Sequence, residues 1–102
     1  MSKDYKITTN IPHFNLTRFS GGISKGVCLN ITKYVSYYES HGLRLTYKEV
    51  LQLKESMINF LRNNKGSEEA CYQLEKGFTL ETKHVKTLIT DLHIYLNDPI
   101  HK

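Results

Sequence analysis

The sequence predicts an α+β fold, with a mainly antiparallel sheet of three to five strands within residues 5–46 and two amphipathic helices at about 47–63 and 82–97. Short segments in the first part of the chain alternate apolar and polar residues with the two-residue period of a strand. The two later segments repeat apolar residues every three or four positions, which gives a helix one buried face. A length of 102 residues suits one domain, residues 1–102, with a single modest core.

The best-defined stretch is a strand that leads directly into the first helix. Leu43 and Leu45 alternate with Arg44, as expected for a half-buried strand. Thr46 and Glu49 then have the spacing of a capping box, in which the hydroxyl and the carboxylate satisfy free backbone N–H groups. This pair predicts that the helix begins at about residue 47.

The first helix has a clear apolar face. Its members recur at three- and four-residue steps, and they are Val50, Leu53, Met57, Phe60 and Leu61. Burying five such side chains contributes on the order of 10 kcal/mol before the entropy of ordering them is subtracted. Asn63, Asn64 and Gly66 are typical helix-stop residues, so we expect the helix to end near residue 63.

The segments before this helix show the alternation of strands. Residues 5–9 alternate weakly, whereas residues 13–19 place Phe14, Leu16 and Arg18 on one side and Asn15, Thr17 and Phe19 on the other. Residues 27–33 place Val27, Leu29 and Ile31 opposite Cys28, Asn30 and Thr32, which is typical of a central strand. The glycines of residues 20–26 favour a plain hairpin loop, because the segment lacks the spacing of known phosphate-binding loops.

Two interpretations are open for the chain after residue 66. Ser67, Glu68 and Glu69 suit the cap of a short helical turn through Ala70, Cys71 and Leu74. Alternatively, residues 71–98 repeat residues 36–63 with a shift of 35 positions, because seven of 28 aligned positions are identical, including Leu45/Leu80 and Val50/Val85. The repeat predicts a second strand that runs directly into the second helix. That helix also has its own apolar stripe, and Asp98-Pro99 ends it.

Basic charge is concentrated in the first part of the chain. Residues 1–48 hold seven Lys and Arg against two Asp and Glu, a balance of +5, whereas residues 49–102 hold seven against eight, a balance of −1. A sheet with this excess would present cations to a polyanion such as a nucleic acid. Ordinary solubilising charge is the alternative interpretation.

Three tyrosines lie within residues 34–38, close to several basic residues. Unpaired bases stack on aromatic rings, and phosphates attract cations. The residues that suit such a surface are Tyr34, Tyr37, Arg18, Lys25, Lys33 and Arg44. The alternative is that the tyrosines are good strand formers whose rings cover the sheet.

The chain has few residues in patterns that suggest catalysis or metal binding. Cys28 and Cys71 lack C-x-x-C spacing and lie in apolar-leaning segments, which predicts two free core thiols. The five histidines are scattered, and no familiar catalytic motif is present. We therefore expect a protein that is not an enzyme and that needs no metal and no cofactor.

The sequence also suggests where in the cell the protein is located. Its apolar runs are too short for a transmembrane span, and the first residues do not open a signal peptide. We expect a cytoplasmic protein, in a cell or an infected host, that does not bind membranes.

Two segments resemble the single-stranded-DNA-binding domain of the positive-cofactor transcriptional coactivators, which has a whirly-type fold. RFSGGISKGVCLNITKY (residues 18–34) resembles the hairpin of that family, and GLRLTYKEVLQLKE (residues 42–55) resembles its last strand and capped helix. In that family a curved antiparallel sheet packs on a helix, helices pair two subunits, and the hairpin strands hold single-stranded nucleic acid. At matching positions the resemblance implies roles for Arg18, Phe19, Lys25 and Lys33. The chain departs from the family in a longer turn and in the helical unit from Ser67 to Leu96.

These features together predict a regulatory protein, acting for instance in transcription, that binds single-stranded DNA or RNA on a basic, tyrosine-rich sheet as a homodimer. The candidate binding residues are Arg18, Phe19, Lys25, Lys33, Tyr34, Tyr37 and Arg44. The alternative is a small phage-type inhibitor or adaptor that binds a host protein or enzyme, since a basic aromatic sheet also suits an acidic protein surface.

Overall fold

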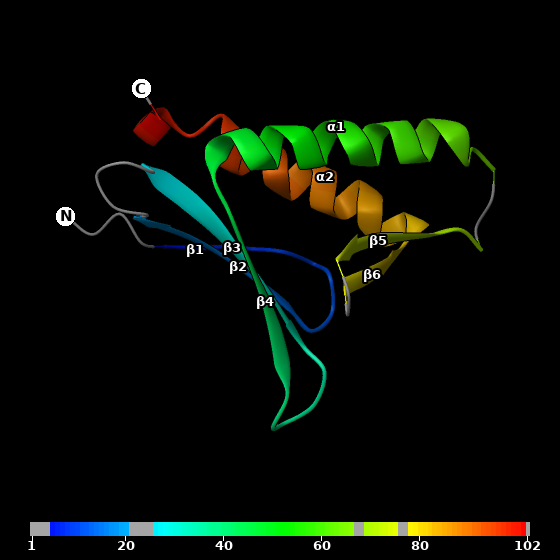
Figure 1. Cartoon of the computed structure of the whole chain (residues 1–102), viewed down its shortest axis with the longest axis horizontal. Coiled ribbons are helices and arrows are strands. Elements are labelled where there is room, and N and C mark those ends of the chain that lie inside the picture. The colour runs from blue at the N-terminus through cyan, green and yellow to red at the C-terminus, as the bar shows by residue number, and fades with distance from the viewer. Residues whose placement is uncertain (1–4, 21–25, 67–68, 76–77, 102) are drawn as a thin grey trace.

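An antiparallel sheet and a pair of helices form the two layers of the structure (Figure 1). The computed structural model describes residues 5–20, 26–66, 69–75 and 78–101. The four strands of the main sheet pair in chain order and are β1 (Tyr5–Ile7), β2 (Phe14–Ser20), β3 (Val27–Tyr34) and β4 (Ser40–Leu45). The remaining elements are α1 (Tyr47–Asn63), β5 (Cys71–Glu75), β6 (Phe78–Glu81), α2 (Thr82–Leu96) and the 3-10 turn η1 (Pro99–His101). The predicted α+β fold is confirmed.

The period-two pattern of the strands divides the main sheet into a covered face and an outer face. Across the sheet, Leu16 pairs with Ile31, and Ile31 pairs with Leu43. Leu16 and Ile31 are fully buried, and Leu43 packs against the same core. Because side chains alternate along a strand, this row fixes the face that the helices cover, and the residues next to it belong to the other, outer face. Cys28 belongs to that outer face by register but is buried. The two sides predicted for residues 14–19 and 27–32 are therefore correct.

The helix α1 begins as its capping box predicts. The Thr46 hydroxyl accepts a hydrogen bond from the Glu49 backbone N–H, and the Glu49 carboxylate accepts one from the Thr46 N–H. Val50 and Met57, on the inner side of this helix, are fully buried. At the other end, the backbone and side-chain N–H groups of Asn64 both donate to the Phe60 carbonyl.

The segment after α1 is a strand, so the helical turn suggested for Ala70 to Leu74 is wrong. In β5 Tyr72 pairs with Leu80 of β6, and the Thr82 hydroxyl donates to the Ala70 carbonyl. These cross-strand bonds satisfy backbone groups that a turn would otherwise pair locally. The competing interpretation matches the structure, because a strand runs directly into a helix twice, with helix starts at residues 47 and 82.

The helix α2 ties the first part of the chain to the second. The Tyr95 hydroxyl donates to the Val27 carbonyl at 2.6 Å, inside the core. The Thr9 hydroxyl donates to the Asp91 carboxylate at 2.6 Å, and Arg18 forms an ion pair with Asp98. The two layers are thus joined by polar bonds as well as by apolar packing.

The cysteines only partly follow prediction. Both are free thiols, as expected. Cys28 is buried, but Cys71 is exposed, so its assignment to the core was wrong. Cys71 starts the strand β5, whose alternation turns Tyr72 and Leu74 inward and Cys71 outward. No helix in the described part of the chain is long and apolar enough to cross a membrane.

Candidate nucleic-acid interface

The register of the main sheet divides the candidate binding residues between its two faces. Phe19, Tyr34 and Arg44 alternate with the buried leucines and isoleucines, so they belong to the outer face. Arg18 and Lys33 share the covered face with Leu16 and Leu29. Lys25 lies outside the described residues.

A row of polar side chains crosses the outer face from one edge of the sheet to the other. Lys6 of β1 pairs with Thr17 of β2, Thr17 with Asn30 of β3, and Asn30 with Arg44 of β4. Neighbouring strands are roughly 4.8 Å apart, so the row is about 14 Å long. Both end residues are exposed cations, and the two central residues can donate and accept hydrogen bonds.

Phe19 and Arg44 lie together at one end of this face. The guanidinium carbon of Arg44 is 5.7 Å from the centroid of the Phe19 ring, within cation–π range. The two side chains line a shallow hollow with Thr17, Ser20 and Asn30. This hollow combines an aromatic ring, a cation and several hydrogen-bonding groups in one place.

The second aromatic residue of the outer face lies at the other end of β3. Tyr34 is four residues beyond Asn30 on the same strand and face, which is roughly 13 Å along the strand. Its side chain is exposed. Asn15 and Thr32 form the polar row between them, and the Asn30 amide donates to the Thr32 hydroxyl at 3.3 Å. The outer face therefore has polar rows bracketed by Phe19 and Tyr34.

Arg18 has a structural role on the covered face. Its guanidinium is paired with the Asp98 carboxylate just after α2, and the two side chains are only 11% and 13% exposed. A charge pair this far from solvent holds two elements together, because neither charge can be left unpaired without a large cost. Lys33 is half-buried on the same face, where it pairs across the sheet with His41.

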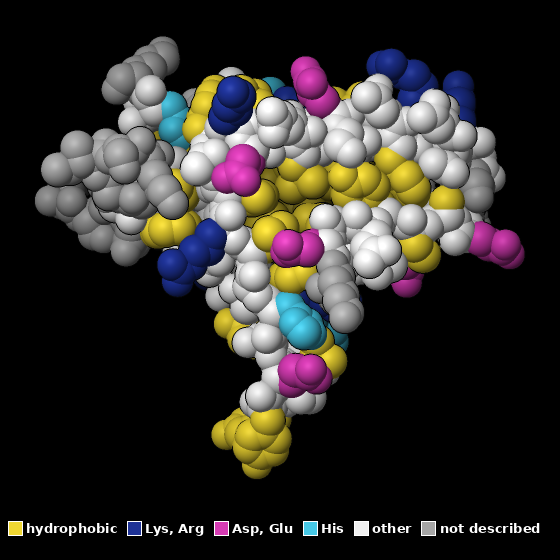
Figure 2. All heavy atoms as spheres, viewed as in Figure 1, with side chains coloured by type: hydrophobic (Ala, Val, Ile, Leu, Met, Phe, Trp, Pro, Cys, Tyr) yellow, Lys and Arg dark blue, Asp and Glu magenta, His cyan; other side chains and the backbone are white. Residues whose placement is uncertain are grey.

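Tyr37 belongs to a third location, the tip of the β3–β4 hairpin. Tyr37 and Tyr38 are each 93% exposed, and their rings meet edge to face with centroids 4.9 Å apart. Figure 2 shows apolar side chains at the end of this projecting hairpin. Tyr37 is thus separated from Phe19 and Arg44 by most of the length of β4.

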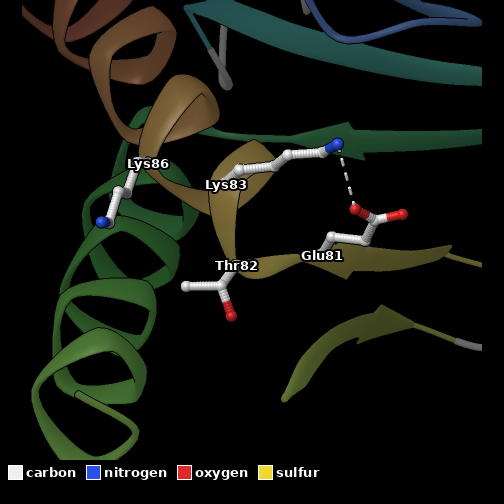
Figure 3. Close-up of a pocket in the computed structure, with 4 residues that line it drawn as sticks. All are labelled: Glu81, Thr82, Lys83 and Lys86. Atoms are coloured by element: carbon white, nitrogen blue, oxygen red, sulfur yellow. Dashed lines mark ion pairs between the residues drawn. The ribbon is translucent and has the colours of Figure 1, made fainter. Parts of the chain in front are cut away.

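A second hollow lies at the start of α2 and is lined by Glu81, Thr82, Lys83 and Lys86 (Figure 3). Lys83 points back to Glu81, and their charged atoms are 3.5 Å apart. The Thr82 hydroxyl donates to the Ala70 carbonyl. Because Glu81 balances one of the two lysines and no aromatic ring is among the described residues that line this hollow, it fits a nucleic acid less well than the outer face does.

Two groups with shifted pKa values, Asp91 and Tyr95, lie in the interior. Burial raises the pKa of the Asp91 carboxyl above its ordinary value of 3.8, and the hydrogen bond from Thr9 opposes that rise. Burial also raises the pKa of the Tyr95 hydroxyl to about 12, with smaller contributions from Cys28 and Tyr47. Among the described residues, no three His, Cys, Asp or Glu side chains come together to hold a metal ion.

Sequence reasoning had not selected Lys6, Thr17 and Asn30 as binding residues. The period-two pattern already put Thr17 and Asn30 on the polar side of their strands. What the sequence does not contain is the register, which aligns them with Lys6 and Arg44 in one row. Comparison with known proteins adds no further assignment, because no family model, curated protein or solved structure matches this chain.

Proposed function

We propose that this protein binds single-stranded DNA or RNA on the outer face of its main sheet and acts as a regulatory protein, for instance in transcription. The observation that carries the proposal is the row Lys6, Thr17, Asn30 and Arg44, with Phe19 beside it. The proposal includes a cytoplasmic location. It also includes a homodimer, which the sequence resemblance implies.

The chemistry of the face suits unpaired rather than paired bases. Aromatic rings that lie flat on a sheet stack on bases whose faces are open, and each such stack contributes about 1–3 kcal/mol. Phe19 and Tyr34, which lie on the outer face at the two ends of the polar rows, would take this role. In a duplex the base faces are already stacked, so these rings would have nothing to contact.

The cations have a separate role. Lys6 and Arg44 lie at opposite edges of the sheet, where the backbone of a strand that crosses the face would pass. Phosphate contacts give affinity without sequence preference, and the central amide and hydroxyls offer hydrogen bonds to base edges. Modest sequence preference with strong salt dependence is therefore expected.

A titration of labelled single-stranded oligonucleotide at two salt concentrations tests the proposal. The affinity should fall as salt rises, because each neutralised phosphate on a single strand contributes a slope of about −0.7 in a log–log plot. A duplex of the same sequence should bind more weakly. Absence of single-strand binding at low salt would overturn the proposal and favour a protein partner instead.

Two variants separate stacking from charge. Arg44→Ala should remove about one phosphate contact from the salt slope. Phe19→Ala should cost about 1–3 kcal/mol of binding and leave the slope nearly unchanged. Lys86→Ala, an exposed lysine on α2, is the matched control and should change neither quantity. Equal effects of Lys86→Ala and Arg44→Ala would mean that net charge, and not this face, determines binding.

A further inference from the structure

We infer that Gly42, on the outer face of β4, forms the floor of a nucleotide subsite, where one nucleotide of a bound single strand lies directly against the sheet. This inference rests on the proposed function. It assigns a role to a residue that has neither charge nor an aromatic ring, because the absence of a side chain at residue 42 is what leaves room for the nucleotide.

Gly42 lies within a paired strand, where glycine is an unfavourable residue. It belongs to β4 and pairs with Thr32 of β3. Glycine has no side chain to pack and loses more backbone freedom on folding than other residues do, so it weakens a strand. A glycine at such a position usually marks a β-bulge or a barrel corner, a backbone conformation closed to other residues, a close approach of protein atoms, or a bound ligand.

The pairing and the backbone of β4 do not require this glycine. The residues of β3 and β4 pair without a shift over the whole length of β4, which excludes a bulge at Gly42. The sheet is open, with β1 and β4 at its two edges, so it has no barrel corner. Among the described glycines, a positive φ occurs at Gly26 and Gly66 and not at Gly42. Another residue could therefore adopt this conformation.

Close packing does not require the glycine either. Among the described residues, a Cβ atom placed at residue 42 would have one neighbour within 4 Å, the side-chain oxygen of Asn30 at 3.9 Å. That separation is an ordinary van der Waals contact, and the position is exposed. Of the usual reasons for a glycine in a strand, the close approach of a ligand is the one that remains.

The neighbours of Gly42 on the outer face suit a nucleotide. Arg44 is two residues along the same strand, and Asn30 and Thr32 lie opposite on β3. The Asn30 amide donates to the Thr32 hydroxyl, and its oxygen is the atom that faces the open position at residue 42. This oxygen can accept a hydrogen bond from an N–H group on the edge of a base, and Arg44 can contact a phosphate.

The subsite continues the hollow that Phe19 and Arg44 line. Arg44 and Asn30 belong to that hollow and are also the neighbours of Gly42. Residues on the same face of a strand are roughly 6.6 Å apart, so Gly42 is one such step from Arg44 towards Tyr34. A single strand that contacts Arg44 and stacks on Tyr34 passes over this position.

A single-stranded nucleic acid is the occupant that the charges favour. Lys6 and Arg44 are exposed cations of the outer face, and none of the described strand residues on that face is acidic. Such a face attracts a polyanion. A base is planar and needs contact area rather than depth, so a position without a side chain suits it.

Enlarging residue 42 tests the inference. Gly42→Val adds a β-branched side chain, which strands accommodate well, so the midpoint of thermal unfolding should stay the same or rise. The same side chain fills the subsite, so the affinity for a labelled single-stranded oligonucleotide should fall at least ~10-fold, a typical effect of losing one base contact. Gly42→Ala adds one methyl group and should weaken binding less. Neither variant changes the charge of the protein, so a weaker electrostatic attraction cannot explain the loss.

Thr79→Ile is the matched control, because it enlarges an exposed side chain of β6, outside the main sheet. It should leave the affinity unchanged. The probes are a mixed-sequence DNA oligonucleotide and the RNA of the same sequence, and Gly42→Val should weaken binding to whichever of them the wild type binds.

The possible failures of the inference and of the proposed function can be told apart. If the wild type binds single strands and Gly42→Val binds equally well, the subsite is rejected and the proposed function stands. A lower thermal midpoint for either Gly42 variant means that the fold requires the glycine, which also overturns the inference. An equal loss of affinity in Thr79→Ile does so too. If the wild type binds neither oligonucleotide, the proposed function and the subsite are rejected together, and a protein partner is favoured.

Discussion

Asp91 is a carboxyl group on the buried side of α2, and it makes the stability of the protein depend on pH. Its pKa is raised by burial, while the Thr9 hydroxyl, 2.6 Å away, limits the rise by donating to the charged form. A raised pKa in the folded state means that the folded protein holds this proton more tightly than the unfolded chain does. The resulting stability is fully present below pH 3.8 and is lost as the pH rises through the folded-state pKa.

We expect Asp91→Asn to stabilise the protein at neutral pH and to have less effect in acid. The amide removes the ionisable group and keeps an oxygen that accepts the Thr9 hydrogen bond. The urea midpoints of wild type and variant should therefore separate as the pH rises from about 4 to 7. A constant difference across this range would contradict the assignment. Thr9→Val, which removes the donor, should enlarge the loss of stability in the protein that keeps Asp91.

The helix α1 divides its residues between the core and the solvent. Met57 is fully buried, whereas the next residue, Ile58, is 36% exposed. Met57→Asp should cost several kcal/mol and prevent folding, because it buries a carboxylate without a partner. Ile58→Asp should cost far less, since its carboxylate remains in water. Thermal unfolding followed by circular dichroism compares the two, and an equal loss would mean that the buried face is assigned incorrectly.

The elements were largely predictable because their signals are local. Thr46 and Glu49 are three residues apart, and the spacing of Val50 and Met57 needs only the helical period. Arg18 was not predictable in the same way. Its strand pattern grouped it with Phe14 and Leu16, but its partner, Asp98, is 80 residues away. Because Arg18 lies beside a basic hairpin in the sequence, it suggested a binding role. In the structure its guanidinium forms an internal ion pair with Asp98.

The outer face of the main sheet also depends on contacts that the sequence pattern does not show. Thr17 and Asn30 were assigned to the polar side of their strands, but which residues lie opposite each other depends on cross-strand register. Register is set by the packing of the opposite, apolar face and by the loops. The position of Lys6 in the polar row is consequently known only once β1 is paired, and Tyr37 lies at the exposed hairpin tip and not in this row.

The contacts of α2 predict one cooperative unfolding transition for the protein. This helix packs on α1 and bonds to residues before β2 and at the start of β3, so neither layer keeps its core if the other is lost. Urea curves followed by helical circular dichroism and by tyrosine fluorescence should coincide. Separate midpoints would mean that the main sheet and the remaining elements form two units and not the single domain expected for residues 1–102.

The long sequence separation of the polar bonds of α2 predicts that this helix docks late in folding. The residues joined by the Thr9–Asp91, Arg18–Asp98 and Tyr95–Val27 bonds are 82, 80 and 68 positions apart, whereas the hairpins of the main sheet join near neighbours. Loop closure costs more entropy as the loop lengthens, so the hairpins form early and the docking of α2 comes late. Until α2 docks, we expect part of the apolar face that includes Leu16, Leu29 and Ile31 to remain in contact with water. The interval between hairpin formation and the arrival of the last helix is therefore the period in which a nascent or refolding chain is most exposed to aggregation.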